Sequence, residues 1–240
     1  MLYGIRMLLL ALHFVGVGLL GLLIGVCRPF NPANSPLFAR LYAKPALRIL
    51  GLDVRASIDT LHALPPGYVI VANHQSNHDL FVLGGIVPER TVSMGKKSLK
   101  WVPLFGQLYW LSGNVLVDRS NAFQARKALK ATTRTLREQH TSIWVFPEGT
   151  RNPAPELLPF KKGAFQMAID AGVPIVPVCV SHYAKGLNLN RWRSGRVEIQ
   201  ALPPLPTEGL GPEDIPALRQ ACQAQMQACI EHLDQRAAQG

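Results

Sequence analysis

The stretch GYVIVANHQSNHD, residues 67–79, decides how this chain is organised. Its first six residues are apolar and rich in β-branched side chains, and two prolines precede them, so residues 67–72 predict a short buried strand. An apolar run that opens at Leu80 predicts a helix directly afterwards. His74 is therefore expected where a strand ends and a helix begins, and in open α/β sheets such positions line the crevices that bind ligands.

The spacing of His74 and Asp79 indicates general-base chemistry. On one continuous helix, side chains five residues apart would point about 140° apart, so a contact between these two needs a turn. Ser76 supplies a reason for that turn, because Ser-x-x-Asp before an apolar run is a capping-box pattern. With Ser76 as the N-cap, the Asp79 carboxylate can reach the His74 imidazole. It would fix the ring tautomer and leave the other ring nitrogen free to accept a proton.

Two other interpretations stay open on these residues alone. Asp79 could be only a helix-capping acid, and His74 only a loop histidine. Alternatively, His74, His78 and Asp79 could bind the metal ion of a hydrolase. Ser76 argues against the unbroken helix that this ligand set needs, and the glutamate of the His-Glu-x-x-His pattern is missing. We therefore expect no metal site here.

The charge balance favours an anionic partner. The 240 residues suffice for one substantial domain with a small appendage, and 25 Lys and Arg against 15 Asp and Glu give a formal charge of +10. Aromatic residues make up only 8%, and no nucleic-acid-binding motif occurs. A phosphorylated substrate or an acidic membrane surface therefore fits better than nucleic acid. The four cysteines lack metal-ligand spacing, which indicates a reduced, cytosol-facing compartment.

Residues 7–26 are expected to attach the chain to a membrane. They are apolar except for His13, are long enough to cross a bilayer, and lack the small-residue cleavage site of a signal peptide. The segment either crosses the bilayer or lies in one leaflet as a helical hairpin with residues 34–50. An excess of basic residues downstream predicts that the main domain lies on the cytoplasmic face of the inner or cell membrane. These basic residues are Arg28, Arg40, Lys44 and Arg48, against Arg6 upstream.

From residue 51 the composition becomes that of a soluble α/β domain. Residues 173–180 form an apolar segment with two prolines, which confine a strand to an edge, a bulge or an irregular stretch. The other expected strands are residues 52–56, 91–94, 115–117, 142–146 and 197–200, and the expected helices are residues 122–138, 161–171 and 212–235.

The sequence FPEGTR, residues 146–151, is the second informative stretch. Gly149 in a tight turn lets the backbone approach a ligand, and Arg151 can bind a phosphate bidentately. Pro-Glu-Gly is also common turn chemistry, so the pattern is weak by itself. Three lysines precede the aromatic stretch 101–106, where they either stay solvated or contact a headgroup or cofactor phosphate; they are Lys96, Lys97 and Lys100.

Four stretches in one order resemble the glycerophospholipid acyltransferase family, and most closely its members that acylate 1-acyl-sn-glycerol-3-phosphate. They are NHQSNHD at 73–79, GNVLVDR at 113–119, FPEGTR at 146–151 and VPIVP at 173–177. The resemblance covers residues 52–205. It implies an α/β acyltransferase core with a mixed β-sheet flanked by helices, within residues 51–240. Residues 1–50 would be the membrane-anchoring helices.

The resemblance also implies site residues and partners. His74, held by Asp79, would take the proton from the sn-2 hydroxyl of the lysophospholipid acceptor, which attacks the acyl thioester directly. The donor would be acyl-CoA or acyl carrier protein, with no metal or bound cofactor. Other family members acylate different lysophospholipids or lyso-ornithine lipid with the same motifs, so the acceptor headgroup stays open. The residues expected at the acceptor's glycerol phosphate are Arg119, Glu148, Gly149, Thr150 and Arg151.

Overall fold

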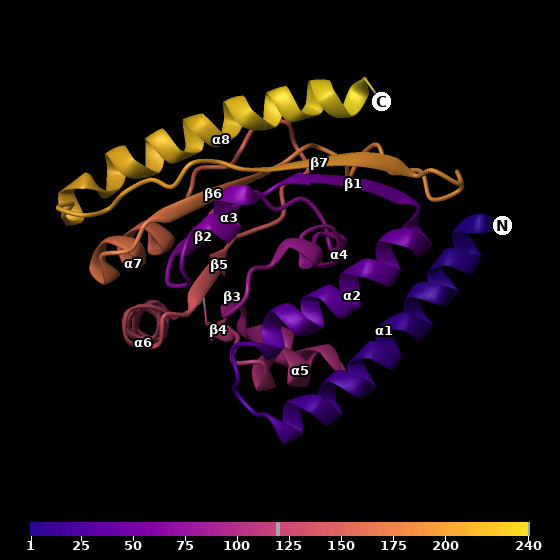
Figure 1. Ribbon diagram of the computed structural model, residues 1–240, viewed down its shortest axis with the longest axis horizontal. Helices are drawn as coiled ribbons and strands as arrows, with labels where there is room; N and C mark the ends of the chain where they lie inside the picture. Colours follow the sequence, from indigo (N-terminus) through magenta and orange to yellow (C-terminus); the bar gives the residue numbers. More distant parts are fainter. Residues whose placement is uncertain (119–120, 240) are drawn as a thin grey trace.

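Seven strands form one mixed sheet in the order β1-β7-β6-β2-β5-β3-β4 (Figure 1). The computed structural model describes residues 1–118 and 121–239. Strands β6, β2, β5, β3 and β4 run parallel to one another, and β7 runs parallel to β1 but antiparallel to β6. The strands are β1 (Leu52–Ser57), β2 (Val69–Ala72), β3 (Thr91–Lys96), β4 (Val115–Val117), β5 (Ser142–Val145), β6 (Ile175–Val180) and β7 (Gly195–Ala201). The mixed sheet expected from the sequence is confirmed.

Helices cover both faces of the sheet because the side chains on both faces of its central strands are apolar and buried. In β2, Val69 and Val71 join the core beneath α6, α7 and α8, whereas Ile70 and Ala72 join a second core with α2, α3 and α4. This alternation is the two-residue period of a strand. The longer helices are α1 (Leu2–Cys27), α2 (Asn34–Leu50), α5 (Phe105–Leu111), α6 (Ala122–Gln139), α7 (Gly163–Ala171) and α8 (Ile215–Ala238), and the short ones are α3 (Asp59–Ala63), α4 (Asp79–Val82) and the 3-10 helix η2 (Lys97–Trp101).

Strand β6 corrects one expectation from the sequence. Its prolines predict an edge or irregular stretch, yet β6 is fully buried between β2 and β7. Pro177 is tolerated because the pairing with β7 begins only at the next residue, Val178, so the missing N–H falls where β7 has already ended. Its carbonyl still accepts a hydrogen bond from Leu202 N at 2.8 Å.

The first two helices form an antiparallel hairpin that packs on the rest of the chain (Figure 1). Three glycines of α1 allow α5 to approach closely. A Cβ atom at Gly21 would lie 2.8 Å from the Leu108 side chain, and one at Gly18 would lie 2.9 Å from Leu104 Cβ. Phe38 and Tyr42 of α2 complete a third apolar core between these helices. Residues 34–50 are thus the second arm of a helical hairpin with α1.

Candidate active site

His74 and Asp79 meet in the loop that leaves the carboxyl end of β2. The Nδ1 atom of His74 lies 2.6 Å from Oδ2 of Asp79. The imidazole stacks on the Phe146 ring, with centroids 4.1 Å apart and planes 16° apart. The His74 side chain is 24% exposed, while that of Asp79 is only 3% exposed. A buried carboxylate on Nδ1 and an aromatic wall therefore fix the ring, and Nε2 is the nitrogen that can serve a substrate.

The turn that joins the pair differs from the expected capping box. The short helix α4 begins at Asp79, and its N-cap residue is His78, not Ser76. Asp79 makes the turn itself, because its Oδ2 accepts hydrogen bonds from the backbone N–H of Gln75 at 2.7 Å and of Ser76 at 3.1 Å. Ser76 Oγ instead accepts from the N–H of His78 at 3.1 Å. The predicted contact is present, but the aspartate creates it by folding the loop around its own carboxylate.

The segment after β6 supports this loop from the other side. The hydroxyl of Tyr183 donates a hydrogen bond to Oδ1 of Asp79. Gln75 accepts from the N–H of Tyr183 at 3.1 Å and donates to the carbonyl of Ser181 at 2.9 Å. Sequence reasoning missed Tyr183 and Gln75 as site residues. Tyr183 lies 104 residues from Asp79, and only the order of the strands shows that β6 follows β2 in the sheet.

Glu148 braces the second motif from inside. It is buried, and its Oε1 accepts from the N–H of His74 at 3.3 Å. Its Oε2 accepts from Asn152 Nδ2 at 2.9 Å and from Leu158 N at 3.0 Å. The N–H of Asn152 in turn donates to the carbonyl of His74 at 2.7 Å. The carboxylate thus ties the loop after β5 to the loop after β2.

The last three residues of this motif lie closer to the surface. Gly149 has a left-handed backbone, with φ of 72°, and a Cβ atom there would lie 2.7 Å from Lys161 Nζ. Thr150 and Arg151 are exposed, and the Arg151 guanidinium donates to Asn77 of the His74 loop. Lys161 is a cation at this site that no local sequence pattern singles out. Arg119, the other expected acceptor-binding residue, lies outside the described residues.

The alternative metal set does not assemble. Within residues 1–118 and 121–239, no group of three or more His, Cys, Asp or Glu side chains is placed to hold a metal ion. His78 turns to Ser76, with Nδ1 lying 3.0 Å from its Oγ. Burial lowers the pKa of His78, against the opposing charge of Asp79. The ring of His78 is therefore a neutral partner of the turn.

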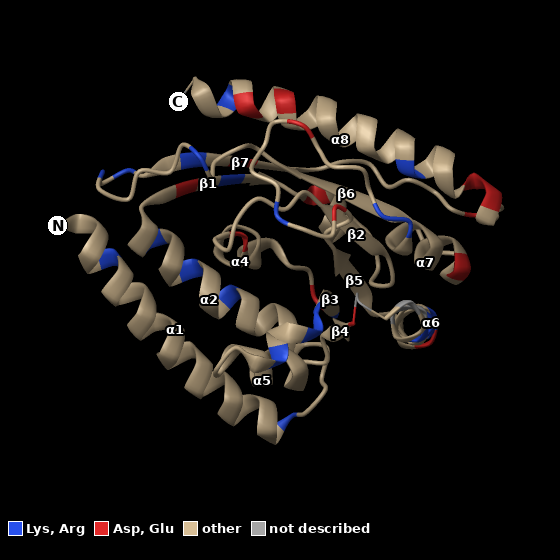
Figure 2. Cartoon of the chain, turned by 180° about the vertical axis from the view of Figure 1, so that it is seen from behind, with Lys and Arg blue, Asp and Glu red and all other residues tan. Residues whose placement is uncertain are grey.

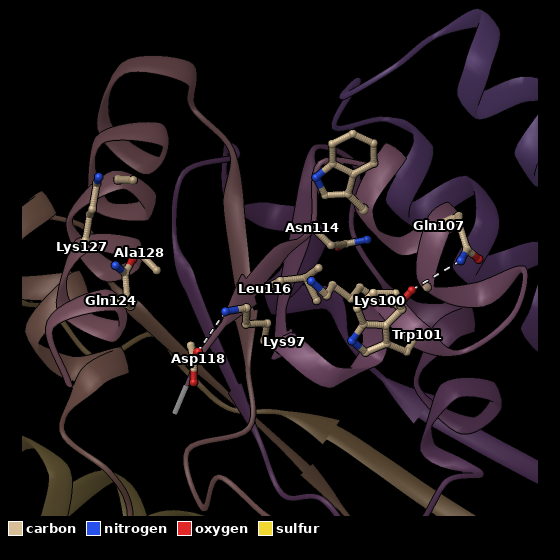
Figure 3. Close-up of a pocket in the computed structure, with 13 residues that line it drawn as sticks. Lys97, Lys100, Trp101, Gln107, Asn114, Leu116, Asp118, Gln124, Lys127 and Ala128 are labelled. Atoms are coloured by element: carbon tan, nitrogen blue, oxygen red, sulfur yellow. Dashed lines mark hydrogen bonds and ion pairs between the residues drawn. The ribbon is translucent and has the colours of Figure 1, made fainter. Parts of the chain in front are cut away.

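A basic groove lies farther along the sheet, between α6 and the η2–α5 segment (Figure 3). Its volume is about 690 Å³, and its lining includes Leu116 of β4 and Asp118 directly after that strand. Lys97 Nζ pairs with Asp118 Oδ2 at 3.0 Å, and Lys100 Nζ lies 4.5 Å from the centroid of the exposed Trp101 ring. Lys127 faces them from α6. The groove thus combines cationic and aromatic groups.

Comparisons with known proteins identify the family. The family described as Acyltransferase matches residues 55–181. The 1-acyl-sn-glycerol-3-phosphate acyltransferase of Salmonella typhimurium is 39% identical over 239 residues, which cover 100% of this chain and 97% of that protein. The chain belongs to this acyltransferase family. The enzyme of the same name from Haemophilus influenzae is 38% identical over 240 residues and is matched over 100% of both chains.

A solved structure supports the fold of this acyltransferase. The crystal structure of the 1-acyl-sn-glycerophosphate acyltransferase from Thermotoga maritima superposes with a TM-score of 0.73 and 24% sequence identity. The superposition covers 96% of this chain and 97% of that one, so it includes the N-terminal helices as well as the sheet. The family and the fold class expected from the four motifs are both confirmed.

Proposed function

We propose that this acyltransferase transfers a fatty acyl group from acyl-CoA or acyl carrier protein to the sn-2 hydroxyl of 1-acyl-sn-glycerol-3-phosphate, which gives phosphatidic acid. The carrying observation is the His74–Asp79 pair, with 2.6 Å between Nδ1 and Oδ2, at the carboxyl end of a central strand. The relatives that match this chain over its full length are named for the same acceptor.

The proposed reaction needs a base and no covalent enzyme intermediate. Nε2 of His74 accepts the proton of the acceptor hydroxyl while that oxygen attacks the carbonyl carbon of the thioester. Asp79, 2.6 Å from Nδ1, stabilises the imidazolium that forms. The tetrahedral intermediate then collapses with cleavage of the carbon–sulfur bond. The leaving thiolate takes the proton back from His74, which restores the neutral ring.

The function is tested with an acceptor panel. Purified protein, one acyl-CoA and four acceptors are compared: lysophosphatidic acid, lysophosphatidylcholine, lysophosphatidylglycerol and lyso-ornithine lipid. We expect the highest kcat/KM with lysophosphatidic acid and phosphatidic acid as its product. A preference for another acceptor would assign the enzyme to a different lysolipid, and hydrolysis of acyl-CoA without transfer would contradict the proposal.

Arg151 is proposed to bind the acceptor phosphate. Its side chain is exposed and contacts Asn77 in the His74 loop. Arg151→Lys keeps the charge but loses the planar pair of donors that matches a phosphate. We expect a roughly tenfold rise in acceptor KM, the effect of about 1.4 kcal/mol, with little change in donor KM and a further loss for Arg151→Ala. A raised acyl-CoA KM with an unchanged acceptor KM would instead place Arg151 at the donor.

The acyl donor is proposed to bind with its phosphates in the basic groove. The sheet order places the ends of β3 and β4 two and three strands from the end of β2, at about 4.8 Å per strand. The groove therefore lies at the carboxyl ends of the parallel strands, as His74 does. Charged and aromatic groups such as Lys100, Lys127 and Trp101 suit phosphates and a planar base.

Charge reversal tests this assignment. We expect Lys100→Glu with Lys127→Glu to raise the KM for acyl-CoA by roughly ten- to a hundredfold, about 1.4 to 2.8 kcal/mol, with an unchanged acceptor KM. Arg55→Glu is the matched control, because Arg55 is exposed on β1 at the opposite edge of the sheet. The same variants are then measured with acyl carrier protein in place of acyl-CoA as the donor. An effect on acceptor KM alone would place the groove at the acceptor side.

Residues 1–50 are proposed to anchor the catalytic domain on the cytoplasmic face of the membrane, with α1 lying in one leaflet. By length and composition α1 could cross a bilayer. However, both of its ends are held by the same domain. Near its start, the buried Arg6 donates to the carbonyls of Leu189, Arg191 and Trp192, and near its end Gly25 packs on α5. A spanning helix would put these ends on opposite sides of the bilayer.

The outer face of α1 is the proposed contact with lipid. Between Arg6 and Arg28 the helix carries no charged residue, as Figure 2 shows. Leu12, Leu19 and Leu23 are among its most exposed residues, at 62%, 57% and 66%. Replacing all three with Gln removes apolar area worth about 1.5–3 kcal/mol per leucine.

We expect this triple variant to bind phosphatidylglycerol-containing vesicles at least a hundredfold more weakly, the effect of about 2.8 kcal/mol. Its activity on acceptor dispersed below the micelle concentration should persist, which separates lost docking from lost fold. Unchanged vesicle binding would show that this face of α1 does not contact lipid.

A further inference from the structure

We propose that Tyr183 is a positioning residue that holds Asp79 and sets how strongly this carboxylate supports the His74 base. The inference rests on the proposed function, because it concerns the proton transfer of that reaction. The mechanism proposed above assigns roles to His74 and Asp79 alone. The structure adds a third member, from a segment that none of the four motifs includes.

The Asp79 carboxylate is fully engaged by donors. Its Oδ2 lies 2.6 Å from His74 Nδ1 and accepts hydrogen bonds from the backbone N–H groups of Gln75 and Ser76 at 2.7 and 3.1 Å. The hydroxyl of Tyr183 donates to Oδ1. Asp79 and Tyr183 are each only 4% exposed, so water cannot readily replace this donor. Within the described chain, the phenol is the side-chain donor that reaches the oxygen turned away from His74.

The position of Tyr183 is itself fixed. Its N–H donates to Gln75 Oε1 at 3.1 Å, and Gln75 Nε2 donates to the carbonyls of Ser181 at 2.9 Å and Val180 at 3.3 Å. Asn73 and Val180 exchange two more hydrogen bonds, each of 2.9 Å. The residues on either side of His74 are therefore fastened to the same segment that carries the phenol. The backbone that carries the phenol is thus fixed relative to the His74 loop.

The phenol acts as a neutral donor. Burial and the adjacent Asp79 charge raise the pKa of Tyr183 far above its ordinary value. A hydrogen bond donated to a carboxylate stabilises its charge and lowers its proton affinity. Asp79 then attracts the proton on the imidazolium less strongly, so the phenol limits the support that the carboxylate gives to the protonated ring. The other titratable or charged groups around this site are His78, Glu148, Arg151, Lys161 and the His182–Asp234 pair, in which Nδ1 and Oδ2 are 2.7 Å apart.

Tyr183→Phe removes the hydroxyl and keeps the ring. We expect kcat at high pH to fall about three- to tenfold, because Asp79 would lose the hydrogen bond that holds it in place against His74, and one hydrogen bond to a charged group contributes modestly. The KM values for donor and acceptor should stay within about twofold of wild type. A tenfold change would correspond to about 1.4 kcal/mol of binding free energy, so this limit means that substrate binding is nearly unchanged. The acidic limb of the pH–rate profile should move to higher pH by roughly half a unit, because Asp79 without the phenol stabilises the imidazolium more strongly.

Two further variants separate tuning from packing. Incorporation of 3-fluorotyrosine at position 183 makes the phenol a stronger donor, so the acidic limb should move to lower pH while the fold is kept. Tyr68→Phe is the matched control. Tyr68 is also buried and its hydroxyl donates to the Leu61 carbonyl at 2.8 Å, before the amino end of β2. This control should lose stability without any shift of the profile.

The outcomes are distinct. Opposite shifts for Tyr183→Phe and 3-fluorotyrosine, with no shift for Tyr68→Phe, support the proposal. In an Asp79→Asn background, Tyr183→Phe should change kcat by less than about twofold, since residues that act as a unit are not additive. An unmoved acidic limb in both Tyr183 variants would overturn the role of Tyr183. Wild-type protein without transferase activity would instead overturn the proposed function.

Discussion

His74→Ala should lower kcat by roughly 10²–10⁴, which is the usual contribution of a positioned general base. The structure explains why so much would depend on one ring. Asp79 binds Nδ1 at 2.6 Å and Phe146 stacks on the imidazole, so the proton acceptor is held before the substrate arrives. Binding of donor and acceptor should survive, which equilibrium binding to vesicles and to acyl-CoA would establish.

His78→Ala is the matched control for this prediction. The two histidines belong to the same turn, but Nδ1 of His78 lies 3.0 Å from Ser76 Oγ, in a contact within the loop. We expect a loss of less than about tenfold from a slightly loosened turn, an effect of about 1.4 kcal/mol or less. Equal losses of kcat at both positions would show that activity depends on the shape of this loop and not specifically on His74 as a base.

Asp79→Asn should lower kcat by roughly 10²–10³, within the range for loss of acid–base support. The backbone N–H groups of Gln75 and Ser76 both point at Oδ2, so they should hold the amide oxygen of Asn at this position, facing His74. The tautomer would then be kept, and the loss would come from the missing charge opposite the imidazolium.

The pH–rate profile distinguishes these two causes. With the charge gone, the imidazolium is less stable, so the acidic limb should move to lower pH, opposite to the shift expected for Tyr183→Phe. A limb that stays in place with the same loss of kcat would indicate a wrong tautomer instead. Thermal unfolding of the variant shows whether the loop has kept its fold.

The local parts of the site could be predicted from the sequence because neighbouring residues determine them. The buried strand before His74, its contact with Asp79 and the position of the second motif after another strand all follow from short apolar runs and turn residues. The capping interpretation of Ser76 was wrong about where the helix begins, because α4 starts at Asp79 with His78 as its N-cap. Ser76 Oγ accepts from the N–H of His78 within the loop, while the Asp79 carboxylate accepts from the N–H groups of Gln75 and Ser76.

The parts that could not be predicted depend on which strands are neighbours. Pro177 signals an edge strand when the chain is considered alone, and only the register with β7 shows where its missing donor falls. Tyr183 belongs to a segment far along the chain that the sheet order brings to the His74 loop, whereas Lys161 lies in the same connection between β5 and α7 as Gly149. Neither residue lies in a pattern of its own, so no local signal distinguishes it from an ordinary loop residue.

The most direct test of the central claim is a double-mutant cycle at His74 and Asp79, read as kcat for phosphatidic acid formation. Asp79 is proposed to act on the reaction only through the His74 ring. The double variant His74→Ala with Asp79→Asn should therefore be no more than about threefold slower than His74→Ala alone. Penalties that simply multiply, so that Asp79→Asn lowers kcat by a further factor of roughly 10²–10³ in the His74→Ala background, would contradict it, because each residue would then act on the reaction independently.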